Sequence, residues 1–344
     1  MALVVGTTTV QVISSRARRV TIKTFPVTMF LAATLIVPTA GAVDVTSPYP
    51  VRPIRLIVPF APGGGTDIVS RTIAQRLTEN LTQTVVVDNR PGGGGTVGAE
   101  IVVNAVPDGY TLILGAANYA TNAALHKLRY DPVKDITPIS LICETGSIVV
   151  LHPTVPIKSV AELIAYAKAK PGALNYGSSG SGGLTHFATE LFDMMAGTRM
   201  THVAYRGSGP ALIDLLAGQI QIMFGSMPST LPHLKTNRLR AIAVTTASRT
   251  TMLPELPAVS EAVPGYEALS WYAVWGPKNL PKNIVTRWNS EIRRLLQLND
   301  VRERMAGEAL QPVGGTPEQF QRTLQNDIAK WIQVVRRSNL KAGE

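Results

Sequence analysis

Residues 54–67 read IRLIVPFAPGGGTD, a short apolar run that passes into a glycine-rich turn. Residues 174–183 read LNYGSSGSGG and repeat the arrangement near the middle of the chain. Each turn leads into an amphipathic stretch with helical spacing. At such a strand-to-helix turn, unpaired backbone N–H groups lie at the positive end of the helix dipole, where an anion can bind them. Two turns that face each other across a cleft would hold a small anion.

Short, apolar and largely branched runs recur along the chain, as expected for strands that are buried on both faces. Besides the run at 174–176, they comprise residues 54–58, 85–88, 111–115, 148–151, 200–204, 220–224 and 239–245. Between these runs the apolar spacing becomes helical, and Ser159–Glu162 and Thr316–Gln319 have the pattern of capping boxes. The alternation predicts an α/β protein with mainly parallel sheets.

The strand-glycine-helix unit occurs once in each half of the chain, which favours two domains. Residues 137–151 are apolar and long enough to cross from the first domain to the second, and residues 239–245 are the expected return. The predicted division is a first domain of residues 43–143 plus 246–344 and a second domain of residues 144–245. Two crossings leave a cleft between the domains, which is a common place for small ligands.

Residues 1–42 have the composition of a secretory signal peptide. A basic segment precedes an apolar stretch at 25–37, and Ala40-Gly41-Ala42 matches an A-x-A cleavage site. The apolar stretch is shorter than the roughly 20 residues of a membrane-spanning helix, which favours cleavage after about Ala42 over a membrane anchor. Paired arginines, Arg18-Arg19, leave both Sec and twin-arginine export open. We expect a soluble, exported, periplasmic protein.

Charge and cysteine content narrow the classes of partner. The formal net charge is +10, and four of the positive charges lie in residues 1–42. The other basic residues are scattered, which argues against nucleic acid and mildly favours anionic ligands. Cys143 is the only cysteine, so the chain can form neither an internal disulfide nor a cysteine metal cluster.

Motifs along nearly the whole mature chain closely resemble those of the Bug-type solute receptors, the extracytoplasmic binding proteins of tripartite tricarboxylate transporters. Their order and spacing are more specific than any single motif. The matching residues are 52–67, 87–92, 107–112, 175–180, 205–208, 214–219, 271–272 and 314–317.

The resemblance implies a type II-like periplasmic-binding-protein fold with two hinge strands, which closes on a small organic carboxylate. It also implies delivery to a membrane permease with a large and a small subunit, and no catalytic residue, cofactor or metal. We expect a monomer.

The resemblance also places ligand contacts in the two glycine-rich loops. Matching positions are Phe60, Gly63, Gly64 and Thr66 in the first loop, and Ser178, Ser179 and Ser181 in the second. Hydroxyls and backbone amides bind a carboxylate reversibly and need no arginine clamp.

Further candidates follow from their position just after predicted strands. These cleft-lining candidates are Asn118, Thr121, Tyr205 and Ser226. Tyr205 is equally compatible with half-buried packing. Asp67 is expected to cap the helix beside the cleft, because a carboxylate caps well but repels an acid.

Two enzyme hypotheses and one sensory hypothesis are alternatives to transport. Residues 93–98 fit G-x-G-x-x-G, but no acidic residue follows at the end of the next strand, as a dinucleotide site would require. Ser179 and Ser181 lie near His186, yet neither is in a Gly-x-Ser-x-Gly elbow. A receptor that signals instead of delivering its ligand would show the same residues. The ligand itself is not named by the sequence.

Overall fold

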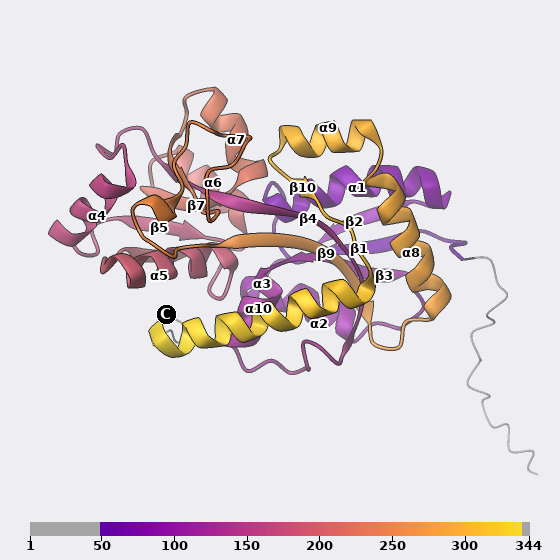
Figure 1. Cartoon of the computed structure of the whole chain (residues 1–344). Helices are drawn as coiled ribbons and strands as arrows, with labels where there is room; N and C mark the ends of the chain where they lie inside the picture. Colours follow the sequence, from indigo (N-terminus) through magenta and orange to yellow (C-terminus); the bar gives the residue numbers. More distant parts are fainter. Residues whose placement is uncertain (1–48, 339–344) are drawn as a thin grey trace, which may run out of the picture. The chain divides into compact units, whose positions relative to one another are not determined.

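In the computed structural model, which describes residues 49–338, ten strands form a sheet with the order β2-β1-β3-β9-β4-β7-β5-β6 (Figure 1). The strands are β1 (Ile54–Val58), β2 (Val85–Asn89), β3 (Thr111–Ala116), β4 (Ile136–Leu151), β5 (Asn175–Ser178), β6 (Thr201–Ala204), β7 (Ile222–Ser226), β8 (Arg240–Val244), β9 (Leu269–Pro277) and β10 (Gln311–Pro312). Strands β8 and β10 are not part of this order, and both pair with β4. The predicted signal peptide, residues 1–42, lies outside the described residues.

Ten α-helices and two 3-10 helices connect or cover these strands in the described part of the chain. They are α1 (Gly65–Leu81), η1 (Gly93–Gly95), α2 (Thr96–Val103), α3 (Asn118–Leu125), α4 (Val160–Ala169), α5 (Leu184–Ala196), α6 (Ser208–Leu216), α7 (Met227–Lys235), η2 (Val259–Glu261), α8 (Lys282–Leu295), α9 (Asn299–Gly307) and α10 (Pro317–Ser338). The predicted capping box at Thr316–Gln319 is present, whereas at Ser159–Glu162 only the bond to the Ser159 side chain is formed and the Glu162 carboxylate accepts from the Lys158 N–H. Ser159 Oγ accepts from the Glu162 N–H at 3.1 Å, and Gln319 Oε1 accepts from the Thr316 N–H at 2.7 Å.

Parallel pairing is confined to the two ends of the sheet. There β1 pairs with β2 and β3, and β5 pairs with β6 and β7. The middle strands β4 and β9 pair antiparallel with each other and with their other neighbours. The prediction of mainly parallel sheets is therefore wrong for the centre. The physical reason is that the chain runs outward along β4 and comes back along β9, in the opposite direction.

Strand β4 joins the two ends of the sheet, whereas residues 239–245, expected as the return strand, do not. The first part of β4 pairs with β9, and its last residues, from Ser147 to Leu151, pair with β7 and β8. Strand β8 pairs only with that last part. The chain returns in β9, which starts opposite Gly146 and continues to β3. The described residues belong to one compact unit.

Helices cover both faces of the sheet at each end, and four hydrophobic clusters result. Around β1 and β3, one cluster contains residues of α1 and α8, and another contains residues of α2, α3 and α10. Around β5 and β7, α4 and α5 contribute to one cluster, and α6 and α7 to another. Side chains alternate across the strand as a period of two requires: Ile54 and Leu56 belong to one cluster and Ile57 to the opposite one.

Helix α10 touches both ends of this arrangement. Figure 1 shows it lying beneath the crossing strands, with its C-terminal end toward α5. It contacts α3, β4 and α5, and Trp331 meets Phe187 of α5 edge to face with ring centroids 5.3 Å apart. Within residues 49–338, no helix is both long and apolar enough to cross a membrane.

Candidate functional site

A cavity of about 40 Å³ lies where five helices begin. Helices α1, α3, α5, α6 and α7 each contribute a first or N-cap residue to its wall. The crossing strands β4 and β9 supply another side. The lining residues are Phe60, Gly64, Gly65, Thr66, Ala116, Asn118, Gly146, Ser147, Ser179, Leu184, Thr185, Ser208, Ser226, Ser270 and Tyr272.

None of these five helices has a side-chain hydrogen bond from its N-cap residue. Four of the N-cap residues, Gly64, Ala117, Gly183 and Gly207, carry no polar side chain. The fifth is Ser226, and its hydroxyl is 2.7 Å from that of Ser229. Apart from Pro210 and Pro228, which have no N–H, and Ala120, which donates to the Ala117 carbonyl, the N–H groups of the first helical turns are thus left for an anion or for water.

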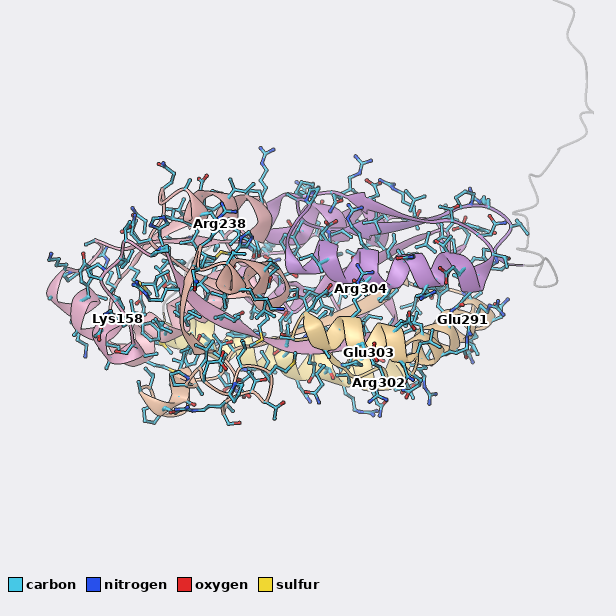
Figure 2. The ribbon with its side chains drawn as sticks, turned by 90° about the horizontal axis from the view of Figure 1, so that it is seen from above. Lys158, Arg238, Glu291, Arg302, Glu303 and Arg304 are labelled. Carbon is cyan, nitrogen blue, oxygen red and sulfur yellow. The ribbon has the colours of Figure 1, made fainter. Side chains whose placement is uncertain are left out.

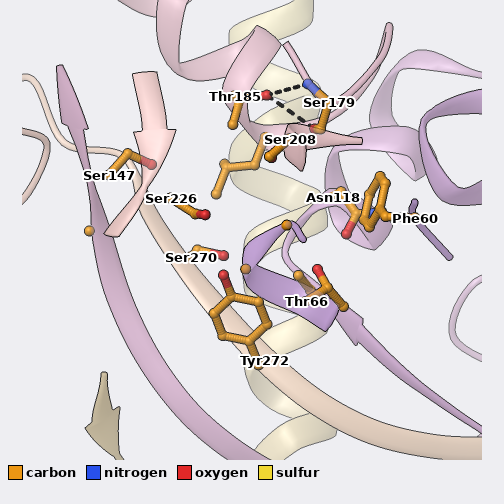
Figure 3. A pocket seen from close by; sticks show the side chains of 15 residues that line it. Phe60, Thr66, Asn118, Ser147, Ser179, Thr185, Ser208, Ser226, Ser270 and Tyr272 are labelled. Atoms are coloured by element: carbon orange, nitrogen blue, oxygen red, sulfur yellow. Dashed lines mark hydrogen bonds between the residues drawn. The ribbon is translucent and has the colours of Figure 1, made fainter. Parts of the chain in front are cut away.

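Eight of the fifteen lining residues carry a hydroxyl group, and Figure 3 shows those of Ser226, Ser270 and Tyr272 gathered on one side. Burial raises the pKa of Tyr272, so its hydroxyl stays protonated and can donate. No lysine, arginine, histidine, aspartate or glutamate is among the described residues that line the cavity. The charged side chains labelled in Figure 2, such as Lys158, Arg238 and Arg304, lie at the outside of the molecule. Positive potential in the cavity therefore comes from helix dipoles.

Six of the predicted site residues line the cavity. They are Phe60, Gly64, Thr66, Asn118, Ser179 and Ser226. Asn118 is 4% exposed, and its amide nitrogen donates to the Gly94 carbonyl at 3.1 Å. Its Oδ1 finds no hydrogen-bond partner among the described residues. An orphaned oxygen on a cavity wall is suited to a ligand hydroxyl or an ordered water.

Five predicted residues lie beside the cavity rather than in its wall. Gly63 is in the turn before α1, with φ +83°, and Ser181 is in the second loop. Thr121 Oγ1 donates to the Gly182 carbonyl at 2.5 Å, and the Tyr205 hydroxyl donates to Asp214 at 2.7 Å. Ser178 Oγ is 2.6 Å from His202 Nε2 and accepts from the Gly180 N–H at 3.1 Å. These three hydroxyls support the walls.

Asp67 is the third residue of α1, and the N-cap residue is Gly64. The expectation that Asp67 occupies the cap position is thus wrong, because α1 begins at Gly65, directly after the first glycines of the turn. Its carboxylate nevertheless holds the turn, since it accepts from the Gly63 N–H at 3.0 Å and from Asn89 Nδ2 at 3.0 Å. Burial alone would raise the pKa of Asp67, but hydrogen bonds from Arg71, Gly63 and Asn89 together hold the pKa below its ordinary value.

The crossing strands contribute lining residues that the sequence analysis did not select. Ser147 lies on β4, and Ser270 and Tyr272 lie on β9. Ser208 and Thr185 come from the first turns of α6 and α5. A signal was present on β9, where Ser270 and Tyr272 are two residues apart and so share one face of a largely apolar strand.

Direct contacts between the first and second halves of the chain lie on two sides of the cavity. The Ala61 N–H, before α1, donates to the Arg206 carbonyl, before α6, at 3.0 Å. On the other side, a Cβ at Gly180 would lie 3.3 Å from the Gly94 Cα, and a Cβ at Gly94 would lie 2.4 Å from the Ser181 carbonyl oxygen. The glycine run at 93–95 thus contacts the second loop closely, because its residues have no side chains.

Comparison with known proteins places this fold and cavity in a defined class. The model of the tripartite tricarboxylate transporter family receptor matches residues 69–340. Protein BugT of Bordetella pertussis is 35% identical over 297 residues, which cover 85% of this chain and 91% of BugT. The chain belongs to this receptor family.

Solved structures agree with this assignment. R. palustris Rpa4515 with adipate is 37% identical, has a TM-score of 0.83, and is matched over 99% of its chain and 85% of this one. MatC from Rhodopseudomonas palustris with bound malate is 31% identical, has a TM-score of 0.80, and is matched over 100% of its chain and 83% of this one. The periplasmic-binding-protein architecture is therefore the fold of this chain.

Proposed function

We propose that this receptor captures a small organic carboxylate in the cavity described above and delivers it to a tripartite tricarboxylate-type membrane transporter. The convergence of five uncapped helix starts on a wall without charged side chains carries the proposal. Helix N-termini and hydroxyls satisfy an anion through directed hydrogen bonds. The relatives that hold adipate and malate support the same ligand class.

Capture requires the molecule to open and close around the ligand. The cavity is lined from two sides, by Gly64, Thr66 and Asn118 of the elements around β1–β3 and by Ser179, Ser208 and Ser226 of the elements around β5–β8. The two lobes are the elements around β1–β3 and those around β5–β8, and β4 and β9 join them. Val259, Val263 and Tyr266 pack in the cluster of α4 and α5, so we place residues up to about 268 in the second lobe instead of ending it at 245.

The remaining parts of the proposal concern location and partners. Export by the segment at 1–42 would bring the receptor to the periplasm. A structural relative, BugD, is a periplasmic binding protein. The permease would have one large and one small membrane subunit. The receptor itself needs no catalytic residue, cofactor or metal for this task.

The first test is to identify what the mature protein carries. Residues 43–344 are purified under mild conditions, the protein is unfolded, and the released small molecules are analysed by mass spectrometry. A thermal-shift panel then compares adipate and malate with adipamide, which has adipate's length but no charge. Stabilisation that rises with carboxylate concentration and is absent with adipamide supports the proposal. Stabilisation by a nucleotide alone would overturn it.

A substitution at Gly65 tests the position of the site. A Cβ at Gly65 would lie 2.5 Å from the Tyr272 hydroxyl and 2.8 Å from Ser226 Oγ, so Gly65→Ala forces cavity hydroxyls to move. We expect carboxylate affinity to fall at least about tenfold, the cost of one misplaced methyl group in a fitted pocket. Gly307→Ala is the matched control, because a Cβ there meets nothing within 4 Å. Equal affinities in both variants, measured by calorimetry, would place the site elsewhere.

A further inference from the structure

Three histidines that are far apart in the sequence meet behind the second glycine-rich loop. His186 of α5 and His202 of β6 stack with ring centroids 4.1 Å apart and planes 16° from parallel. Tyr176 of β5 stacks on His202 at 4.9 Å. His126, the residue after α3, is the third, and a Cβ at Gly182 would lie 2.7 Å from its Nε2. Among the described residues no group of histidine, cysteine or carboxylate side chains could hold a metal ion.

The hydrogen bond at His186 defines the charge of this ring. The Gly182 backbone N–H donates to His186 Nδ1 at 3.3 Å. A backbone N–H can only donate, so Nδ1 has to be an unprotonated acceptor and the imidazole has to be neutral. His186 is 3% exposed. Protonation at Nδ1 would place two donors against each other and remove the support of Gly182.

The surroundings of His186 oppose a positive charge. Burial, followed by the nearby His202 and His126, lowers the pKa of His186 to about 3. Tyr176 stacks on it at 6.4 Å, and Glu190 Oε1 lies 3.9 Å from its Nε2 while accepting from the Tyr176 hydroxyl at 2.5 Å. At 3.9 Å, Glu190 is beyond hydrogen-bond reach, so it offsets only part of the cost of a charged ring.

Closure of the cleft completes this environment. His126 and Thr121 belong to the lobe of β1–β3, whereas His186 and Gly182 belong to the other lobe. Thr121 donates to the Gly182 carbonyl, so Gly182 is held from both sides, by His186 through its N–H and by α3 through its carbonyl. In the open form that the proposed function requires, α3 withdraws from Gly182 and His126 withdraws from His186, so that water can reach this side of the ring. An imidazole in water is protonated far more readily than a buried one.

We propose that His186 is a positioning residue of the binding loop and that closure over the ligand requires its neutral form, so that carboxylate capture weakens as the medium becomes acidic. The inference rests on the proposed function. His186 acts through Gly182 on the loop that carries Ser179 and leads to Thr185, both of which line the cavity. It does not touch the ligand.

The direction of the pH effect follows from linkage. The pKa of His186 is about 3 in the closed form and near the ordinary value of about 6.5 when the ring is hydrated. Because the closed form binds fewer protons, its advantage is complete above pH 6.5 and is lost as the pH falls toward 3. One pH unit below 6.5 corresponds to about a tenfold loss of affinity.

The experiment measures affinity by calorimetry at pH 7.5 and 5.5 for the mature protein and three variants, with adipate and malate as probes. His186→Asn keeps an acceptor near the Nδ1 position but cannot titrate, and His186→Phe keeps the ring without an acceptor. His152→Asn is the control, because His152 pairs locally with Thr154 at 2.7 Å. Thermal unfolding without any carboxylate is recorded for the same proteins at both pH values.

Three results support the proposal together. Between pH 7.5 and pH 5.5, the affinity of wild type and of His152→Asn falls about tenfold more than the affinity of His186→Asn. His186→Asn binds within about threefold of wild type at pH 7.5, whereas His186→Phe binds at least tenfold more weakly. Identical pH profiles for wild type and His186→Asn overturn the inference.

The ligand-free measurement separates this inference from the proposed function. If neither probe binds any variant at pH 7.5, the choice of ligand class fails first. A ligand-free protein held closed then decides: Gly64→Cys plus Ser208→Cys can be cross-linked by oxidation, because the Cβ positions lie 3.6 Å apart. In that oxidised protein, a larger drop in unfolding temperature between pH 7.5 and 5.5 with His186 than with His186→Asn retains the role of His186, and equal drops remove it.

Discussion

Asp67 places a negative charge beside a cavity that we assign to an anion, and its partners explain how the two coexist. Its side chain is buried, and the guanidinium of Arg71 lies 2.9 Å from its carboxylate. The carboxylate also binds the Gly63 N–H and Asn89. Its carboxylate therefore fixes the turn that presents Gly64 and Gly65. Arg71 compensates the negative charge on the side away from the cavity wall.

We predict that Asp67→Ala costs about 1–3 kcal/mol of unfolding free energy, the usual range for a buried charged hydrogen-bond acceptor. It should also weaken carboxylate binding, because the turn before α1 loses its anchor. The lowered pKa of Asp67 means that this contribution is present above pH 4 and lost as the pH falls below it. Urea unfolding at pH 7 and pH 3 measures the loss of stability and its dependence on pH.

Glu79→Ala is the control for Asp67→Ala, since Glu79 is on the same helix and forms an exposed pair with Arg76. Its effect should stay within about 0.5 kcal/mol. If the two variants are equally stable at pH 7, Asp67 does not hold the turn.

At the scale of elements, the rule that ligands bind at the carboxyl ends of parallel strands explains which cavity-lining residues the sequence selected. Asn118 follows β3 and Ser226 is the last residue of β7, and this rule selects both. Ser270 and Tyr272 were missed because β9 is antiparallel and passes the cavity along its length. Thr121 and Tyr205 satisfy the rule, but their hydroxyls are occupied by the Gly182 carbonyl and Asp214. The Gly182 contact is remote in sequence, so local patterns do not predict it.

The clustering of His126, His186 and His202 is another feature that sequence spacing could not show. The three residues come from a helix end, a helix and a strand, and they meet only because α3 and α5 pack across the cleft. In contrast, the start of β1, the Ser159 cap and the capping box at Thr316–Gln319 depend on neighbouring residues alone, and these were predicted correctly.

Helix α10 is predicted to stabilise the closed arrangement as well as the fold. Trp331 is fully buried, and it packs on Phe187 of α5 in a cluster that also contains Ala120 of α3. Trp331→Ala should cost about 3–5 kcal/mol, as expected for removing a large buried aromatic ring. Chemical denaturation measures the change. Gln333→Ala, two residues further along the helix and exposed, should change it by less than about 0.5 kcal/mol. A small effect at Trp331 would mean that α10 is not part of the core.

For the whole molecule, the central question is whether a ligand can enter only when the lobes separate. The turn before α1 and the start of α6 come from different lobes and touch at the cavity. A Cβ built at Gly64 lies 3.6 Å from the Ser208 Cβ, and Gly64 has an ordinary φ of −85°. That spacing is within the range of a disulfide. Cys143 is completely buried, so it should not compete for the new thiols.

We therefore predict that the double variant Gly64→Cys plus Ser208→Cys, once oxidised, exchanges ligand at least about a hundredfold more slowly than its reduced form, because opening becomes limited by the cross-link. The protein is loaded with a carboxylate, oxidised and dialysed, and the retained ligand is quantified by mass spectrometry before and after reduction. Each single cysteine variant, treated in the same way, controls for the loss of Gly64 or the Ser208 hydroxyl from the wall. Retention that ends on reduction would establish lobe separation as the route of entry. Equal loss from oxidised and reduced protein would show that ligand reaches the cavity without it.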